Sequence, residues 1–238
     1  MKERHRIVAA FSEMAQRYET QMNNELNRFW GWSYDEFVDR LLKNVHIRSN
    51  DAILDVATGT SVIPVRLIKT TPNLKQIVGL DITFEMLLKG RQKILSLLNE
   101  GIIEMVCGNA LAMPLASSSF NIVFCGLATH HMDVKALLTE IHRLLKPHGK
   151  LAIADVGGAQ SWKNPIVRFL VRMLAFAYFF FTENKTRAWV EASALTNIRT
   201  IQEWQAVLLE LGFDDIAVNE IKSKKFWVPN PLIINAKK

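Results

Sequence analysis

The chain has 238 residues, of which 49% are hydrophobic and 22% are charged. This composition is typical of a soluble globular protein and gives ample apolar material for one α/β domain with additions. The formal net charge is +6, but the positive residues are scattered, and neither of the densest runs, at 2–6 and 222–225, lies in a nucleic-acid-binding motif. We therefore interpret the charge as solvated surface and expect no nucleic-acid partner.

The two cysteines, Cys107 and Cys125, have neither the number nor the spacing of a disulfide framework or a metal site. The N-terminal residues are charged and lack the apolar stretch of a signal peptide. A cytoplasmic location is therefore the expectation.

Residues 1–48 are predicted to form an N-terminal helical cap. Apolar residues in "IVAAFSEMAQRYETQM" recur close to a 3.6-residue period, at Ile7, Val8, Phe11, Met14, Ala15 and Tyr18. "YDEFVDRLLKNV" (34–45) continues the helical pattern. These helices precede the first strand and could lie across its end.

Residues 49–238 are predicted to form the core domain, in which strands and helices alternate as far as residue 156. Continuously apolar runs predict strands at 52–56, 76–81, 102–108, 120–127 and 150–156. Helices are expected at 61–70, from Thr83 toward Asn99, and after a cap at Asp133, and "KPHG" (146–149) is expected to turn into the fifth strand. Alternating strands and helices indicate βαβ units, hence a Rossmann-like, seven-stranded, mostly parallel sheet.

The pattern changes after residue 156. A helical lid insertion is expected over 160–198, with a very apolar helix at 165–181 and a polar helical segment at 183–197. An amphipathic helix at 200–213 follows, and then two strands, 214–221 and 226–236, that should form a C-terminal antiparallel hairpin. Pro229 and Pro231 suggest an edge or a bulge in the last strand.

Two carboxylates end neighbouring strands of the predicted sheet. Asp55 ends the first strand, Gly59 follows in the tight turn, and Asp81 ends the second strand. Parallel α/β sheets bind ligands at this edge, where a glycine lets the backbone approach the ligand and an acid can accept the hydroxyls of a ribose.

The turn at 55–61 does not fit a nicotinamide dinucleotide. It has one glycine instead of G-x-G-x-x-G, and Asp55 would repel a pyrophosphate. The same features suit a nucleoside that carries a cationic amino-acid tail, with its ammonium near Asp55 and its ribose on Asp81. S-adenosyl-L-methionine is such a ligand.

At this point the chain resembles a known family. "ILDVATGTS", "VGLDITFEML", "GNALAMPLASSSFNIVFCGLATHH" and "IHRLLKPHGKLAIADV" match, in order and spacing, the class I S-adenosylmethionine-dependent methyltransferases over residues 52–156. The residues of these motifs, together with an N-terminal "F...A.RY" segment, look most like the ubiquinone/menaquinone C-methyltransferase branch and its small-molecule relatives. The resemblance implies a methyltransferase of small-molecule biosynthesis with S-adenosyl-L-methionine as its cofactor.

The resemblance also implies a set of cofactor-binding residues. Asp55, Ala57 and Gly59 would line the methionine part, Asp81 would hold the ribose, and Tyr18 would close over the cofactor. The full set implied is Tyr18, Asp55, Ala57, Thr58, Gly59, Asp81, Ile82, Asn109, Ala110 and Leu127.

The chain departs from the family pattern at three places. Ala57 and Ser61 stand where glycines are common, and Asn109 stands where many relatives have an aspartate. After the fourth strand, residues 128–131 read Ala-Thr-His-His, whereas the quinone enzymes generally carry Arg-Asn. The last difference weakens the case for a quinone acceptor, but not the case for methyl transfer.

The candidate catalytic residues are His130, His131 and Asp155. The histidines follow the fourth strand, where an acceptor would meet the methyl group, and a neutral imidazole there could take a proton from the acceptor. Asp155 ends the fifth strand as a second candidate base, and a packing role for the histidines stays open. No third ligand of plausible spacing accompanies the histidines, so no metal is expected.

The apolar segment at 165–181 predicts the acceptor site. Its aromatic side chains suggest a small hydrophobic or aromatic acceptor, methylated on carbon or oxygen, with Phe169, Met173, Phe176 and Phe180 beside it. At 17 residues, with Arg168 and Arg172 on one face, the segment is a poor transmembrane helix and reads as a lid. A peripheral membrane contact is compatible with it.

Two other functions stay open at this stage. An RNA methyltransferase is favoured only by the basic charge, and a module that binds the cofactor without transferring its methyl group is the non-enzymatic alternative. The chain could act as a monomer or a homodimer.

Overall fold

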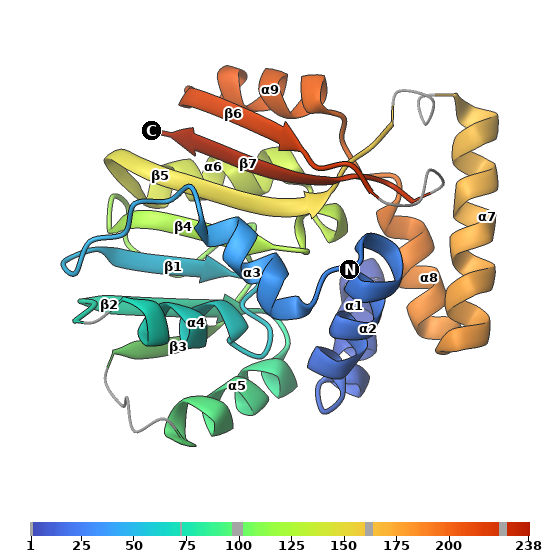
Figure 1. Cartoon of the computed structure of the whole chain (residues 1–238), viewed down its shortest axis with the longest axis horizontal. Helices are drawn as coiled ribbons and strands as arrows, with labels where there is room; N and C mark the ends of the chain where they lie inside the picture. The colour runs from blue at the N-terminus through green and yellow to red at the C-terminus, as the bar shows by residue number, and fades with distance from the viewer. Residues whose placement is uncertain (1, 72, 97–101, 160–163, 224–227) are drawn as a thin grey trace.

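The computed structural model describes residues 2–71, 73–96, 102–159, 164–223 and 228–238. A seven-stranded sheet in the order β3-β2-β1-β4-β5-β7-β6 runs through its centre (Figure 1). The strands are β1 (Ala52–Val56), β2 (Gln76–Asp81), β3 (Ile103–Cys107), β4 (Phe120–Gly126), β5 (Leu145–Val156), β6 (Asp214–Glu220) and β7 (Pro231–Lys237). β1 to β5 pair in parallel, whereas β7 pairs antiparallel with both β5 and β6. The predicted fold class, with its C-terminal hairpin, is confirmed.

Successive residues of the central strands enter two different cores, because side chains in a strand alternate between the faces of the sheet. Ile53 packs in the core that includes α3 (Tyr34–Leu42) and α4 (Val62–Thr70). Leu54 packs in the opposite core, with α6 (Val134–Leu144) and α9 (Ile201–Glu210). α5 (Phe84–Ser96) packs against β2 and β3. Both faces of the sheet are therefore covered, which accounts for the apolar strands.

A helical cap lies beyond the carboxyl ends of the parallel strands (Figure 1). It is built from two distant segments, which supply α1 (Lys2–Met14) with α2 (Tyr18–Trp30), and α7 (Pro165–Thr182) with α8 (Lys185–Ala194). Arg17 pairs with Glu183 at 2.8 Å, and Asn184 Nδ2 donates to Glu13 Oε1 at 2.8 Å. The predicted N-terminal cap and lid insertion thus meet as one layer over the ligand-binding edge.

The N-terminal cap differs from its predicted form. The single helical pattern through Tyr18 is broken after Met14, where turn hydrogen bonds such as that from Arg17 N to Met14 O close α1, and Tyr18 begins α2. α3 belongs to the sheet layer, because its apolar face packs on the strands.

Two predicted strand boundaries are also corrected. β5 starts at Leu145, so residues 146–149 lie within it as an irregularity where the register with β4 shifts and His148 takes a positive φ. β7 is an interior strand, and Pro231 is tolerated because it is the first residue. Residues 224–227, at the start of the predicted last strand, and the predicted end of the helix near Asn99 lie outside the described residues.

Candidate functional site

The loop between β1 and α4 has the backbone shape of a glycine-rich turn. Ala57, Gly59 and Ser61 have φ values of 57°, 54° and 61°, in the left-handed region. Ala57 and Ser61 are the positions where the resemblance expects glycine, so the chain keeps the loop's conformation at some cost in backbone strain. Strain of this kind is typical of functional sites that the surrounding structure holds in place.

Asp55, at the end of β1, is a fully buried carboxylate. Neither of its oxygens has a hydrogen-bond partner among the described residues. Burial raises the pKa of Asp55 to about 7; the nearby Thr58 hydroxyl, which is itself without a hydrogen-bond partner in the described chain, acts to lower it, and the Asp81 carboxylate acts to raise it. A buried, unpartnered acid at a ligand-binding strand end fits a cationic ligand group, such as the ammonium of an amino-acid tail.

Asp81, at the end of β2, lies across the loop from Asp55. Its Oδ2 accepts from Gly59 N at 2.8 Å and its Oδ1 accepts from Thr83 N at 2.8 Å. Burial raises the pKa of Asp81, while these backbone donors act in the opposite direction. The carboxylate therefore ties the two neighbouring strand ends together at the place where the ribose is expected.

Tyr18 closes over the loop from α2. A side chain added at Gly59 would lie 3.6 Å from the Tyr18 ring, and Tyr18 packs edge-on against Tyr34. The neighbouring Glu19 accepts hydrogen bonds from Thr60 Oγ1 at 2.7 Å and from Lys93 Nζ at 2.5 Å. Tyr18 thus lies beside Gly59, in a cap that side-chain hydrogen bonds fasten to the loop.

The other predicted cofactor residues surround this edge of the sheet. Thr58 is buried and its N–H donates to Leu80 O, and Ile82 directly follows Asp81. Asn109 Oδ1 accepts from Leu111 N at 3.1 Å, which turns the chain after β3, and Ala110 is buried beside it. Leu127 has a φ of 53° and lines the cavity described below.

His130 and Asp155 form a buried pair at the ends of β4 and β5. His130 Nδ1 lies 2.5 Å from Asp155 Oδ1, and the same carboxylate accepts from Thr129 Oγ1 and from the backbone N–H of Val156 at 2.7 Å. Burial acts to lower the pKa of His130, but the Asp155 carboxylate outweighs it, and the pKa is raised. Burial acts to raise the pKa of Asp155, yet His130 and Thr129 hold it below its usual value.

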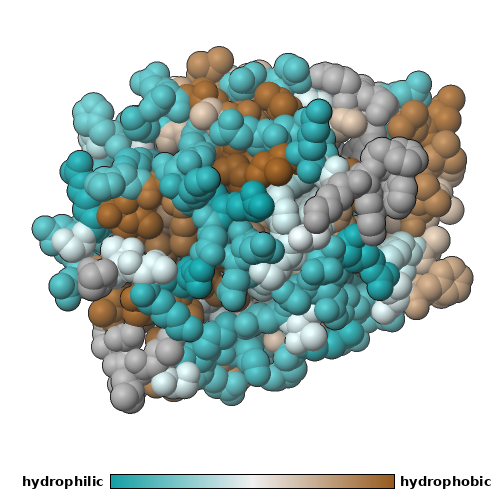
Figure 2. Space-filling model, viewed as in Figure 1, coloured by the Kyte–Doolittle hydropathy of each residue, from teal (hydrophilic) through white to brown (hydrophobic). Residues whose placement is uncertain are grey.

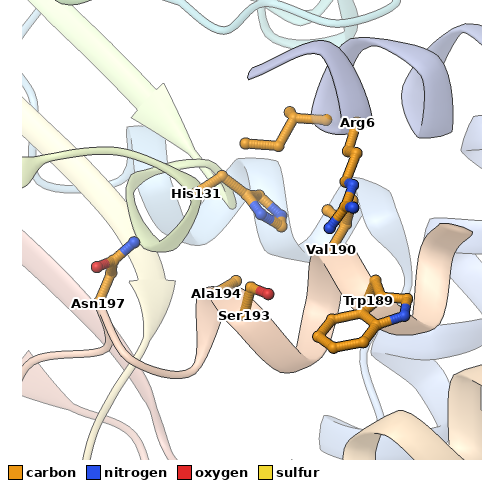
Figure 3. Close-up of a pocket in the computed structure, with 8 residues that line it drawn as sticks. Arg6, His131, Trp189, Val190, Ser193, Ala194 and Asn197 are labelled. Carbon is orange, nitrogen blue, oxygen red and sulfur yellow. The ribbon is translucent and has the colours of Figure 1, made fainter. Parts of the chain in front are cut away.

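The surroundings of His131 favour its neutral form. Burial, with His130 and Arg187 acting the same way, holds the pKa of His131 well below its usual value. Its ring lies between α1 and α8 (Figure 3), where it borders a cavity of about 270 Å³ together with Arg6 and Trp189. His131 also lines the larger cavity, so its ring separates the two.

The structure brings a third potential metal ligand to the histidines, which the sequence spacing did not indicate. Glu191 on α8 places a carboxylate within 4.8 Å of the ligand atoms of His130 and His131. However, Asp155 already engages His130 Nδ1, and the Arg187 guanidinium lies 2.9 Å from Glu191. A divalent cation would meet this fixed positive charge, so the absence of a metal stays our prediction.

A cavity of about 550 Å³ opens between the cap and the strand ends. Aromatic and aliphatic side chains dominate its wall, and Tyr18, Leu127, His130 and His131 all border it. The cap therefore covers a partly open apolar chamber that borders both the predicted cofactor side and His130.

The face of α7 that lines the cavity differs from the predicted one. The lining residues of this helix are Val171, Leu174, Ala175, Tyr178 and Phe179. Of the predicted residues, Phe169, Met173 and Phe180 are exposed, and Phe176 packs on Phe180 and Trp189. A helix that is apolar on every side gives no periodic signal for its inner face, which is why the sequence did not indicate the face that lines the cavity.

Four charged residues of the cavity were not predicted. Arg187 and Glu191 come from α8, Glu25 and Arg28 come from α2, and all four line the chamber. Arg187 and Glu191 are four residues apart, the spacing of a helical ion pair, and this was the one local signal that could have drawn attention to them.

Comparisons with known proteins agree with this geometry. Residues 54–153 match the family model described as a methyltransferase domain. The chain is 26% identical over 226 residues to the demethylmenaquinone methyltransferase of Staphylococcus epidermidis, which covers 90% of this chain and 88% of that protein.

Two solved structures show the same fold. An S-adenosylmethionine-dependent methyltransferase from Aquifex aeolicus superposes with a TM-score of 0.62 at 16% identity, covering 95% of this chain and 97% of that one. A Haemonchus contortus phosphoethanolamine N-methyltransferase, solved with phosphomonomethylethanolamine and S-adenosylhomocysteine, superposes with a TM-score of 0.64 at 16% identity. The second superposition covers 88% of this chain and 53% of that one.

Proposed function

We propose a specific function for this chain, which belongs to the S-adenosylmethionine-dependent methyltransferase family: it methylates a small hydrophobic or aromatic acceptor on carbon or oxygen. That the protein is a small-molecule methyltransferase follows from its family. The nature of the acceptor is our inference from the cavity, and it rests on one observation in particular. His130, which is paired with the buried Asp155, lines an apolar chamber directly beside the cofactor edge of the sheet.

The residues at the strand ends fit the cofactor. Asp55 offers a buried carboxylate without a partner to the ammonium of the amino-acid tail, and Asp81 offers carboxylate oxygens to the ribose. Tyr18 covers the loop from the cap side. When bound, S-adenosyl-L-methionine supplies an electrophilic methyl group, so the protein mainly has to align a nucleophile with it.

His130 is our candidate general base. Its Nδ1 is engaged by Asp155, which leaves Nε2 as the ring nitrogen available to a proton of the acceptor. Asp155 is 1% exposed and holds three other donors besides, so we assign it the task of orienting His130 instead of contacting the acceptor. Both assignments keep the residues that the sequence indicated but give them different roles.

The lining of the chamber supports the proposed acceptor class. Phe11, Phe29, Tyr178 and Phe179 line it, and a cavity of about 550 Å³ has room for a bicyclic aromatic compound. By its name, the Staphylococcus epidermidis relative acts on demethylmenaquinone. A quinol-like acceptor is therefore our preferred case, although Ala128 and Thr129 replace the Arg-Asn of the quinone enzymes.

We propose a cytoplasmic enzyme with a peripheral membrane contact, and the exterior of α7 supports the contact. Among the described residues, α7 is a helix long and apolar enough to cross a membrane by length and composition alone. One of its faces lines the chamber and the other faces solvent. We read α7 as a lid that touches the bilayer surface, from which a lipophilic acceptor could be collected.

Methyl transfer can be tested with a panel of hydroxylated naphthalenes and quinols by measuring the release of S-adenosylhomocysteine. We expect turnover on at least one of these compounds, and His130→Ala should lower it roughly 10²–10⁴-fold while the affinity for S-adenosylhomocysteine is retained. Binding of the cofactor without turnover on any compound would favour the non-enzymatic alternative. RNA is included as a control, and methyl transfer to it would favour an RNA methyltransferase.

A further inference from the structure

Arg187 is a buried cation that its protein neighbours satisfy only in part. It belongs to α8, is 4% exposed and lines the large cavity. Its guanidinium carbon lies 5.0 Å from the ring centre of Phe11 and 5.6 Å from that of Phe179. The protein therefore holds this charge against aromatic rings in a place from which water is largely excluded.

The contacts of Arg187 use one edge of the guanidinium. Nη2 lies 2.9 Å from a Glu191 oxygen and 3.8 Å from a Glu25 oxygen. Nε and Nη1 are buried and have no hydrogen-bond partner within the described part of the chain. Buried polar groups in native proteins are almost always hydrogen-bonded, so two unused donors at a cavity wall point to a ligand that supplies the acceptor atoms.

An anion complements this arrangement better than a neutral group does. The two unused donors belong to a cation, and a hydrogen bond from a charged donor to an oxyanion is among the strongest in proteins. The other titratable groups that line the cavity are Glu25, Arg28, Glu191, His130, His131, Tyr18 and Tyr178, and Arg28 donates to the Tyr178 hydroxyl at 3.0 Å. Glu191, the nearer carboxylate, contacts Nη2 and leaves Nε and Nη1 without a partner in the described chain.

We infer that Arg187 binds the acceptor through an anionic oxygen, a phenolate or an enolate, and so selects acceptors that carry an acidic hydroxyl group. The inference rests on the proposed function. In the step involved, the O–H bond of the acceptor breaks, its electron pair stays on oxygen, and the proton passes to Nε2 of His130. Arg187 stabilises the negative charge that remains, so a larger share of the bound acceptor is ionised at neutral pH, and the ionised form is a stronger nucleophile at its ring carbon or oxygen than the neutral form.

The Nε and Nη1 donors of Arg187 should also make binding selective for acceptors with an ionisable hydroxyl group. An acceptor without an ionisable hydroxyl group would leave Nε and Nη1 buried and unpaired, so it should bind more weakly than an otherwise similar phenol. The aromatic walls would accept either compound, because they recognise shape and apolar surface only.

The test uses 4-nitro-1-naphthol, whose phenolate absorbs visible light, and its methyl ether, which cannot ionise. Both are titrated into protein saturated with S-adenosylhomocysteine. We expect the naphthol to bind at least about tenfold more tightly than the ether at neutral pH, and its phenolate band to persist in the bound state about one pH unit lower than in water.

Variants assign the effect to the residue. Arg187→Met should abolish both the preference and the spectral shift, whereas Arg172→Met, on the part of α7 outside the cavity, should change neither. Because Glu25 and Glu191 could destabilise the methionine variant, Arg187→Lys serves as a second variant: it keeps the charge but lacks the guanidinium fork, and it should show a reduced shift.

Three results would overturn the inference: equal binding of naphthol and ether by the unmodified protein, a full shift in folded Arg187→Met, or loss of the shift in Arg28→Met instead. Calorimetry with S-adenosylhomocysteine separates this failure from that of the proposed function. Normal cofactor binding without a phenolate preference contradicts only the role of Arg187, whereas absence of cofactor binding contradicts the methyltransferase assignment itself.

Discussion

Asp55 couples cofactor binding to pH. Its carboxylate is fully buried, lacks a partner in the described chain and has a pKa of about 7, so near neutral pH a large share of the unliganded protein carries it protonated. Only the ionised form attracts an ammonium group strongly. The carboxylate that should bind the ammonium of the amino-acid tail therefore becomes ionised as the pH rises.

We expect the affinity for S-adenosylhomocysteine to rise roughly tenfold between about pH 6 and pH 8, because the ionised fraction of Asp55 rises through its pKa of about 7. Calorimetric titration across this range measures the effect. Asp55→Asn should bind more weakly at high pH and show a nearly flat profile. A steep profile that survives in this variant would assign the pH dependence to another group.

The raised pKa of Asp55 also affects the free energy of unfolding. The folded protein holds the Asp55 proton up to about pH 7, whereas the unfolded chain releases it near the ordinary aspartate pKa of about 4. Asp55 therefore contributes stability below about pH 4, and this contribution is lost as the pH rises toward 7. A bound ammonium group would offset the loss.

Among the individual residues around His130, the sequence indicated those that lie at or just after the ends of strands. Asp55, Asp81, His130 and Asp155 could be found because the ends of parallel strands converge at one edge of a sheet. Arg187 and Glu191 could not be placed, since α8 reaches the site only through the packing of the cap, about 60 residues after the histidines. Nothing in a local pattern encodes such a contact.

Among the elements, α2 acts as a fastened cover over the cofactor loop. Glu19 joins α2 to Thr60 in the loop and to Lys93 on α5, and Lys93 Nζ also donates to Thr60 O at 3.1 Å. Tyr18, the adjacent residue, lies against the loop at Gly59. Release of a bound cofactor would require these contacts to open.

Glu19→Gln should speed the release of S-adenosylhomocysteine by about two- to five-fold, because a partly exposed ion pair of this kind contributes up to about 1 kcal/mol. Stopped-flow displacement, followed by tryptophan fluorescence, measures the rate. The matched control is Glu210→Gln, which breaks a pair of the same length between α6 and α9, away from the cap. Equal release rates in both variants would rule out a covering role for α2.

The lid shows how far an element can be predicted. The helix at 165–182 and its capping residue Asn164 follow from an apolar run after a turn-forming residue. Its orientation does not follow, because Phe179 faces the cavity and Phe180 faces solvent although both are phenylalanines. Only packing against α8 and α2 decides between them.

At the scale of the whole molecule, the position of α7 indicates an interaction surface. It stands at the outer edge of the cap (Figure 1), and Figure 2 shows apolar side chains gathered along that edge. The exposed apolar residues of α7 are Ile166, Phe169, Leu170, Met173, Leu174, Phe180 and Phe181. An apolar face of this extent is unusual on a soluble surface and marks an interaction site.

We propose a bilayer surface with anionic lipids as the occupant of this face. Arg168 and Arg172 lie on the same helix, and the chain carries a net charge of +6. Leu174 is 71% exposed and also lines the chamber, so the contact face and the cavity wall are continuous. Apolar burial and attraction to anionic headgroups would then act together, as they do for helices that lie in the plane of a membrane interface.

We expect the protein to sediment with vesicles of phosphatidylcholine that contain about one third phosphatidylglycerol, and to be released in part by high salt, which screens the arginines. The double variant Phe169→Ser, Phe181→Ser should reduce binding strongly, because it removes the two rings that would enter the interface. Leu209→Ser, on α9, removes an equally exposed apolar residue elsewhere and should leave binding unchanged. Protein that stays in the supernatant would contradict the membrane contact, whereas protein that only detergent extracts would identify α7 as an anchor instead of a lid.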